Sequence, residues 1–317
     1  MADIITIGDG MVTMDPATKG PMRFVNSFVR KVGGAELNFA VGCARLGLDV
    51  GWISRLGKDE FGRVVKKFMA SEGVDMSQVK FVNDYPTALN FKEILEDGSA
   101  RIFYYRQGTA TTTMTPDDLN PDYFKQAKLL HITGVFPAIA EHYIPIMQRA
   151  LELAKEHNLL VSFDPNIRLR LWKSKEAARE VLTSFLPYVD IVLTGIDEAE
   201  LLLGTNEPKK IVERFYQYGA GYVSIKKGKD GSVGAYGSEY IESPPVKERK
   251  VVDTVGAGDG YDAGFIYGVM NGWSLERTLK FANTIGAMVV SVTGDNEGLP
   301  YYEDVLMYMG EMEYIER

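Results

Sequence analysis

The chain has 317 residues, with 35 Lys and Arg against 43 Asp and Glu, and a net charge of −8. This acidic balance disfavours nucleic acid and anionic membrane as partners, because both carry negative charge. Hydrophobic residues make up 45% of the chain and no apolar run reaches the ~20 residues of a membrane span, so we expect a globular protein with a full core and no membrane contact.

The chain begins with the strand-like MADIITIG, which does not read as a signal peptide, so we expect a cytoplasmic protein. The lone cysteine, Cys43, excludes an internal disulfide and a thiolate metal cluster. It lies in an apolar helical stretch, which predicts a packed core residue.

Strand-like runs then alternate with helix-length segments. We expect strands at 3–8, 49–57, 128–133, 159–163, 190–194 and 222–226, and helices at 35–46, 59–72, 141–156, 175–186, 197–203 and 208–217. The alternation predicts an α/β fold in three layers, with a mainly parallel central sheet flanked by helices on both faces. We expect one domain over residues 1–317, closed by a helix in the acidic stretch 301–317.

Two segments interrupt the alternation. PMRFVNSFVRK (21–31) and TALNFKEILEDGSARIFYYR (87–106) read as extended strands, the second as a hairpin that turns at Asp97-Gly98. We expect the inserted segments at about 12–33 and 85–113 to form a small β-sheet lid over the edge of the main sheet. A flat lid exposes an apolar face, so we expect a homo-oligomer that pairs through it.

A glycine-rich turn carries the strongest chemical signal. It lies in VVDTVGAGDGYDAGF (251–265), after strand-like residues 249–252 and before an expected helix at about 258–271. Ligands of α/β sheets bind beyond the carboxyl ends of the strands. Bare backbone N–H groups at a helix N-terminus attract phosphate, so the turn predicts an anion site.

The N–H groups of Gly256, Ala257 and Gly258 are the expected donors, and Asp259 follows them directly. Phosphoryl transfer to an alcohol needs a base near the hydroxyl and donors around the phosphoryl group, and this stretch offers both. An ordinary helix-capping aspartate after a tight turn is the alternative. The turn is not a Walker P-loop, because no Lys-Ser/Thr pair follows the glycines.

A second motif lies near the N-terminus, where VGGAELNFAVGCARLG (32–47) is followed by GKDEFG (57–62). Gly33 and Gly34 let the backbone approach a ligand closely. Asn38, one helical turn later, offers the donor and acceptor that vicinal hydroxyls require. A helix that simply begins after a glycine turn is the alternative.

Together these motifs resemble the ribokinase family of carbohydrate kinases. DTVGAGD is similar to the family's C-terminal signature, GGAELNFA with GKDEFG is similar to its N-terminal one, and the resemblance runs from about residue 3 to 300. It implies a ribokinase-like fold and ATP as phosphoryl donor, with Asp259 as the base and Gly256, Ala257 and Gly258 as the anion hole. Asp253 resembles a residue that in many members helps hold a monovalent cation, a role left open here.

The family often has an Asn-x-x-Glu motif that organises Mg²⁺ through water. The corresponding stretch, TGIDEAELL, has Gly195 at the asparagine position and Glu198 at the glutamate position. The resemblance implies that Glu198 acts on a magnesium-bound water. Mg²⁺ is also expected on electrostatic grounds, because the charge of the ATP phosphates must be neutralised during transfer.

Two arginines indicate the class of substrate. In RIFYYRQG, Tyr104 and Arg106 share one face of a strand, and Arg168 in SFDPNIRLRLW follows a central strand. Arginine binds a carboxylate in bidentate fashion, so two arginines favour a sugar acid over a neutral sugar. An exposed lid arginine and a surface-loop arginine are the alternatives.

FYYR, FDPNIRLRLW and GDNEGLP are most similar to family members that phosphorylate a keto-deoxy sugar acid such as 2-keto-3-deoxygluconate on its terminal hydroxyl. The resemblance places ATP at Lys226 and Gly228 of SIKKGKDG and at the glycine turn, with Asn283 on a late helix near the adenine. The resemblance also assigns seven residues to the substrate pocket: Gly34, Asn90, Tyr104, Arg106, Arg168, Asp259 and Asp295. We add Asn38 of the N-terminal motif to this pocket.

Three alternatives remain. A neutral-sugar kinase of the fructokinase or ribokinase type uses the same chemistry on another substrate, and a sensor without catalysis uses the same fold. A Rossmann dehydrogenase is disfavoured, because no G-x-G-x-x-G follows the first strand. Of the histidines, His131 is expected to be packed in a strand, and His142 and His157 to lie on helix surfaces without a catalytic role.

Overall fold

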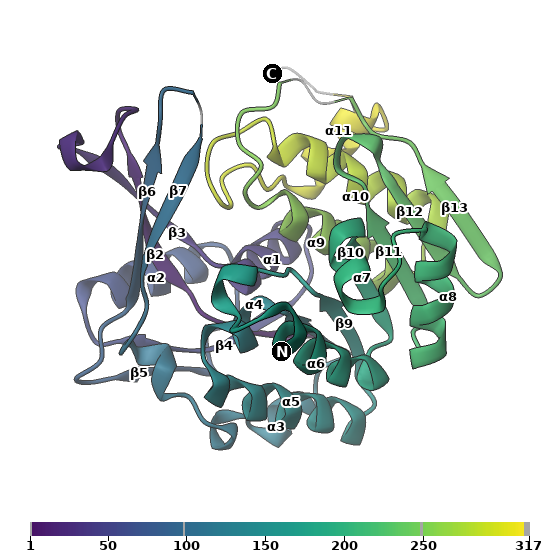
Figure 1. The fold of residues 1–317 in the computed structure, drawn as a ribbon, viewed down its shortest axis with the longest axis horizontal. Helices are drawn as coiled ribbons and strands as arrows, with labels where there is room; N and C mark the ends of the chain where they lie inside the picture. Colours follow the sequence, from purple (N-terminus) through teal and green to yellow (C-terminus); the bar gives the residue numbers. More distant parts are fainter. Residues whose placement is uncertain (1, 98, 248–249, 314–317) are drawn as a thin grey trace.

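A nine-stranded sheet forms the centre of the protein, and a four-stranded sheet stands beside it (Figure 1). The computed structural model describes residues 2–97, 99–247 and 250–313. The strands of the large sheet are β1 (Ile4–Ile7), β4 (Val50–Gly57), β5 (Val79–Val82), β8 (Leu129–Thr133), β9 (Leu160–Asp164), β10 (Ile191–Gly195), β11 (Tyr222–Lys226), β12 (Ser232–Tyr236) and β13 (Glu239–Ser243).

The strand order of this sheet is β13-β12-β11-β10-β9-β8-β1-β4-β5. All pairs from β5 to β11 are parallel, and β12 and β13 add an antiparallel hairpin at one edge. The chain runs outward in both directions from β1, so the order reverses there. Ligands bind at the carboxyl ends of the strands near such a reversal.

Helices cover both faces of the large sheet, as the alternation predicts. They are α1 (Ala35–Arg45), α2 (Glu60–Ser71), α3 (Pro121–Phe124), α4 (Val135–Ile139), α5 (Ile144–Glu156), α6 (Lys175–Phe185), α7 (Ile196–Leu203), α8 (Pro208–Tyr218), α9 (Ala257–Met270), α10 (Leu275–Val289) and α11 (Tyr302–Met309). No helix in the described ranges is long and apolar enough to cross a membrane.

The strands supply two separate apolar cores because successive side chains point to opposite faces. In β1, Ile4 belongs to the core that includes residues of α1, α9 and α10, whereas Ile5 and Ile7 belong to the core that includes residues of α4 to α8. Cys43 is fully buried in the first of these cores, as expected. The two cores together make the three-layer α/β architecture.

The smaller sheet consists of β2 (Met11–Pro16), β3 (Phe28–Gly33), β6 (Ala88–Ile94) and β7 (Ala100–Tyr105), in the order β3-β2-β6-β7. It is built from the segments that the sequence assigns to the lid, and we call it the lid. The hairpin of β6 and β7 is confirmed by its antiparallel pairing; Gly98 of the predicted turn lies outside the described residues.

Three predictions about local structure were wrong or incomplete. Residues 21–31 are not one strand: Pro21, with φ −57°, precedes a 3-10 turn at Met22–Phe24, and β3 begins only at Phe28. The strands β2 and β5 and the β12–β13 hairpin were not predicted. Residues 250–252 form no strand. The chain there instead bonds to the end of α10, where Val252 N donates to Val290 O at 2.7 Å. Residue 249 lies outside the described part of the chain.

Helix α9 is held against α10 by glycines. A Cβ atom on Gly264 would lie 2.7 Å from Ile285 Cδ1, and one on Gly268 would lie 2.4 Å from Thr278 Oγ1. This close approach fixes the position of α9 and therefore of its N-terminus, which begins one residue earlier than predicted, at Ala257.

Candidate active site

A cavity of about 1330 Å³ opens between the lid, the carboxyl ends of β9 to β11 and the N-terminus of α9. It collects most of the predicted site residues from distant parts of the chain. Ala257 and Asn283 are not among its lining residues. The predicted residues that line it are Gly34, Asn38, Asn90, Tyr104, Arg106, Arg168, Glu198, Lys226, Gly228, Gly256, Gly258, Asp259 and Asp295.

Asp259 lies in the first turn of α9 with 9% of its surface exposed. Its Oδ2 accepts a hydrogen bond of 2.8 Å from Asn38 Nδ2. Asn296 Nδ2 lies 3.4 Å from Asn38 Oδ1, which sets the orientation of the Asn38 amide. Asn38 thus holds the Asp259 carboxylate at the wall of the cavity, and Asn296 in turn holds Asn38.

Burial raises the pKa of Asp259 to about 7, although the Asn38 hydrogen bond and the nearby Lys226 act in the opposite direction. The negative charge of Asp164 adds to the increase. A carboxylate with a pKa near neutrality accepts a proton better than an ordinary aspartate and is still ionised in much of the population.

Lys226 places a fixed positive charge beneath the turn. Its Nζ lies 3.0 Å from Asp164 Oδ2 and 3.0 Å from Asp262 Oδ1, and 3.8 Å from the position of a Cβ atom on Gly258. Burial alone lowers the pKa of Lys226, but the two carboxylates outweigh it and raise the pKa above the usual value. The lysine therefore stays charged next to the glycine turn.

The glycine turn leads into α9: Gly256 and Gly258 line the cavity, whereas Ala257 N donates a 3.5 Å hydrogen bond to the carbonyl oxygen of Thr254. Among the described residues no side chain caps the N-terminus of α9, and Gly256 has φ +78°. The first N–H groups of a helix have no acceptor within the helix, and the helix dipole adds positive potential there. A side chain on Gly256 does not fit, because its Cβ atom would lie 2.0 Å from the carbonyl oxygen of Asp295.

The lid supplies the opposite wall. Arg106 is 9% exposed and its guanidinium lies 4.2 Å from the Tyr104 ring centroid. In the described part of the chain, Arg106 Nε and Nη1 and Asn90 Oδ1 have no hydrogen-bond partner. Buried polar atoms are nearly always paired, so these groups indicate a site that a polar ligand completes.

Comparison with known proteins decides the family. The model of the "pfkB family carbohydrate kinase" matches residues 1–301. The chain belongs to the pfkB family of carbohydrate kinases. It is therefore a carbohydrate kinase with a ribokinase-like fold, as the two sequence signatures predict.

Relatives of this kinase carry two related substrate names. It is 33% identical over 316 residues to a 2-dehydro-3-deoxygluconokinase of Bacillus subtilis, covering 99% of this chain and 98% of the relative. It is also 33% identical over 324 residues to a 5-dehydro-2-deoxygluconokinase of Clostridium tetani, covering 98% and 93%. A solved structure from E. coli in complex with ATP and Mg²⁺ superposes with a TM-score of 0.87 at 25% identity, covering 98% of this chain and all (100%) of that one.

The buried cavity acids that were not predicted include Asp164, Asp9 and Glu36, and the last two lie nearest the N-terminal motif. Asp9, directly beyond β1, is 3% exposed and accepts a 2.8 Å hydrogen bond from Thr111 Oγ1. Glu36 is 1% exposed and accepts one from Thr133 Oγ1 at 2.5 Å. Burial raises the pKa of both, that of Glu36 to about 7. The position of Asp9 after the first strand was an available signal, because strand ends form the site in this fold class.

Glu198 makes two backbone contacts. Its Oε1 accepts from Ile167 N at 2.9 Å and its Oε2 from Gly195 N at 2.8 Å. Burial and the charge of Asp164 raise its pKa. No cluster of three or more His, Cys, Asp or Glu among the described residues is arranged to hold a metal ion. A single carboxylate fits an ion held mainly by phosphates and water.

Asn283 lies on α10, outside the cavity lining. Its Nδ2 donates to Ser243 Oγ at 3.0 Å and so ties α10 to β13. Its nucleotide role stays a prediction. His131 is packed as expected: it is stacked on Phe39 with ring centroids 3.7 Å apart, and burial lowers its pKa to about 3.

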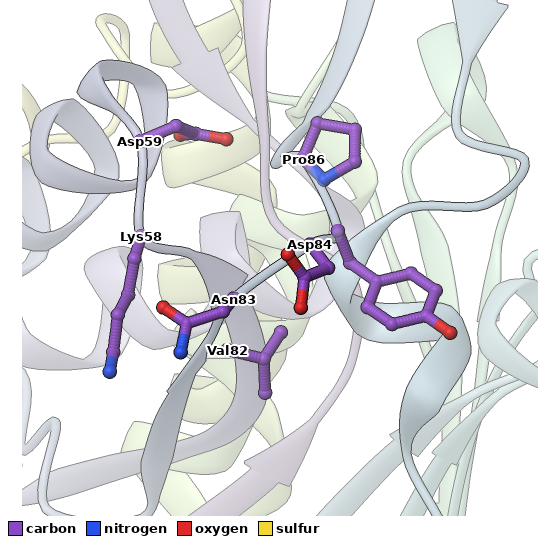
Figure 2. A pocket seen from close by; sticks show the side chains of 7 residues that line it. Lys58, Asp59, Val82, Asn83, Asp84 and Pro86 are labelled. Carbon is purple, nitrogen blue, oxygen red and sulfur yellow. The ribbon is translucent and has the colours of Figure 1, made fainter.

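A second hollow, of about 560 Å³, lies apart from the cavity at the base of the lid, between residues 58–59 and 82–86 (Figure 2). It contains Asp59 of the GKDEFG motif. The Asp59 carboxylate accepts hydrogen bonds from Gly62 N and Thr87 N, both at 2.7 Å, and so caps α2 and ties it to the lid. The motif therefore has a structural role here.

We predict that Gly256→Ala destabilises the protein by more than about 2 kcal/mol, because it adds a clash with Asp295 to the ~1 kcal/mol cost of a left-handed alanine. Gly237→Ala is the matched control: Gly237 has φ +57° and open space around it, so only the backbone cost applies. Urea unfolding measures both. Equal losses in the two variants would show that the Asp295 contact does not constrain the turn.

Proposed function

We propose that this kinase transfers the γ-phosphoryl group of ATP to the terminal hydroxyl of 2-keto-3-deoxygluconate, also called 2-dehydro-3-deoxygluconate, giving 2-keto-3-deoxy-6-phosphogluconate. The observation that carries the proposal is the juxtaposition of Asp259 with the uncapped N-terminus of α9, in the cavity that Arg106 also lines. The name of the Bacillus subtilis relative supports the substrate.

In the proposed reaction, Asp259 takes the proton of the sugar hydroxyl as the hydroxyl oxygen forms its bond to the γ-phosphorus. The bond from that phosphorus to the β–γ bridging oxygen breaks, and ADP leaves. The N–H groups at Gly256, Ala257 and Gly258 stabilise the charge on the transferring group, and Lys226 reinforces them. Closure of the lid excludes water and so protects ATP from hydrolysis.

ATP is assigned to the side of the cavity formed by Lys226, Gly228 and the glycine turn, supported by the ATP and Mg²⁺ complex of the E. coli neighbour. Glu198 is assigned to a magnesium-bound water, and Mg²⁺ supplies neutralisation of phosphate charge. The monovalent cation near Asp253 stays a prediction, tested by activity with and without KCl. So does the cytoplasmic location.

The sugar acid is assigned to the lid side. Arg106 and Arg168 both line the cavity. Arg106 Nε lies 3.9 Å from Asp9 Oδ2, and Arg106 Nη1, which has no hydrogen-bond partner among the described residues, suits a substrate carboxylate. A 5-keto-2-deoxy sugar acid is the second candidate substrate, favoured by the name of the Clostridium tetani relative. Assaying ADP formation with both keto-deoxy acids, the galactonate epimer, ribose and fructose separates the candidates. A sensor without catalysis forms no ADP with any of them.

We expect Asp259→Asn to lower turnover by ~10²–10⁴, the usual contribution of a general base, with little change in ATP affinity by calorimetry. In the wild type, kcat/KM should fall tenfold per pH unit below about pH 7, because the protonated carboxyl cannot accept the hydroxyl proton. Asp122→Asn, an exposed change on α3, is the control. Near-normal turnover in Asp259→Asn contradicts the base assignment.

We expect Arg106→Ala and Arg168→Ala each to raise KM for the sugar acid by about tenfold or more, with a smaller effect on kcat, because a charged hydrogen bond contributes ~1.5–3 kcal/mol. Arg149→Ala, on the surface of α5, is the control. If both cavity variants keep the wild-type KM, the carboxylate assignment is wrong.

The outer face of the lid supports the proposed homo-oligomer. Side chains alternate along the strands, so Phe91, Phe103 and Tyr105 point away from the cavity that Asn90 and Tyr104 line. Phe28 and Tyr105 both pack edge-on against Phe91, and Tyr105 is still 58% exposed. An exposed apolar sheet face of this kind suits a second copy of the chain.

We expect light scattering to give a dimer or larger assembly for the wild type, and Tyr105→Lys to shift it to the monomer without change in circular dichroism. Phe24→Lys is the matched control, because Phe24 is 70% exposed but lies in the 3-10 turn outside this face. A monomeric wild type contradicts pairing through the lid.

A further inference from the structure

A buried charge cluster joins the lid to the loop at 293–297. Lys92 of β6 is 4% exposed, and its Nζ lies 2.6 Å from Asp295 Oδ1 and 3.3 Å from Asp15 Oδ1. Asp15 and Asp295 are themselves 6% and 8% exposed. Asp15 has a second positive partner, because Lys31 Nζ lies 3.4 Å from its Oδ2, whereas Lys92 is the cation that pairs with Asp295.

Strand alternation places this cluster on the inner face of the lid. Lys92 lies two residues from Asn90, which lines the cavity, and Asp15 and Lys31 point to the same side from β2 and β3. Lys31 Nζ reaches the same loop, at 3.0 Å from the carbonyl oxygen of Thr293 and 3.4 Å from Glu297 Oε1. Figure 1 shows the segment that precedes α11 between the lid and α9.

Asp295 touches both the sugar side and the phosphate side of the cavity. A Cβ atom on Gly33 would lie 2.2 Å from Asp295 Oδ2, and one on Gly256 would lie 2.0 Å from its carbonyl oxygen. The side chain of Asp295 thus pairs with Lys92 of the lid, and its backbone carbonyl packs against Gly256 of the anion-binding turn.

We propose that Lys92 is a positioning residue, which keeps Asp295 ionised and in place for the sugar acid and couples the position of the lid to the glycine turn. The inference rests on the proposed function, because it needs Asp295 in the sugar pocket. Lys92 does not reach the cavity lining itself; it acts through Asp295. Buried carboxylates that lose their only cation either protonate or move.

The electrostatics agree with this role. Burial raises the pKa of Asp295, and Lys92 is the main influence in the opposite direction. Removing Lys92 therefore raises the pKa of Asp295 further. The charged groups that face this carboxylate and its lysine are Asp15, Lys31, Glu297 and Asp253.

We expect Lys92→Met to raise KM for the sugar acid by about tenfold, with kcat less affected. The KM of this variant should become dependent on pH, falling as the pH rises, because protonation removes the charge of Asp295 and weakens its hydrogen bonds from the substrate. Lys92→Arg, which keeps the charge, should restore a pH-independent KM.

The double variant Lys92→Met with Asp295→Asn identifies the titrating group: its KM should be high but independent of pH. Lys19→Met, an exposed change in the lid loop, is the matched control. A Lys92→Met enzyme with the wild-type KM at every pH overturns the proposal, as does a double variant that keeps the pH dependence. A wild type that forms no ADP from any sugar acid contradicts the proposed function instead, before any variant is compared.

Discussion

The arrangement depends on one carboxylate held out of water at a helix N-terminus. Water favours ionised Asp259 strongly, so burying it is costly unless its environment compensates. The Asn38 amide and the dipole of α9 favour the charged form, whereas burial and Asp164 favour the neutral form. These opposing effects leave the pKa of Asp259 near neutrality, which suits a group that must take a proton and later release it.

Lys226 and its two carboxylate partners next to the glycine turn have opposing effects on one another's pKa values. Lys226 lies between Asp164 and Asp262, and burial raises the pKa of Asp262 well above its usual value while Lys226 lowers that of Asp164. One carboxyl of this pair is thus favoured as neutral and the other as ionised. The lysine stays charged close to Gly258, where a phosphate would lie, so the anion site has a permanent cation as well as backbone donors.

Local sequence patterns predict the parts of this site that consist of consecutive residues. The run from Gly256 to Asp259 places donors and carboxylate together by covalent connection, so the sequence alone finds them. Lys92 becomes recognisable only when the lid pairing brings it to Asp295 at the edge of the cavity. The β12–β13 hairpin was missed because the alternation of strands and helices, which predicts the parallel part of the sheet, does not extend to an antiparallel hairpin at its edge.

Two residues that the family resemblance assigns to the nucleotide side also have partners within the fold. Asn283 Nδ2 donates to Ser243 Oγ and so ties α10 to β13. Glu198 similarly uses both oxygens to hold backbone N–H groups. The same types of polar residue stabilise loops and bind ligands, so the sequence alone does not distinguish the two roles; the hydrogen-bond partners in the structure do.

The most direct test is a crystal structure with 2-keto-3-deoxygluconate and a non-hydrolysable ATP analogue. We expect the Asp259 carboxylate within hydrogen-bond distance of the terminal sugar hydroxyl, the γ-phosphate at the N-terminus of α9 and the sugar carboxylate on Arg106 or Arg168. An Asp259 side chain turned away from every substrate oxygen would contradict this expectation.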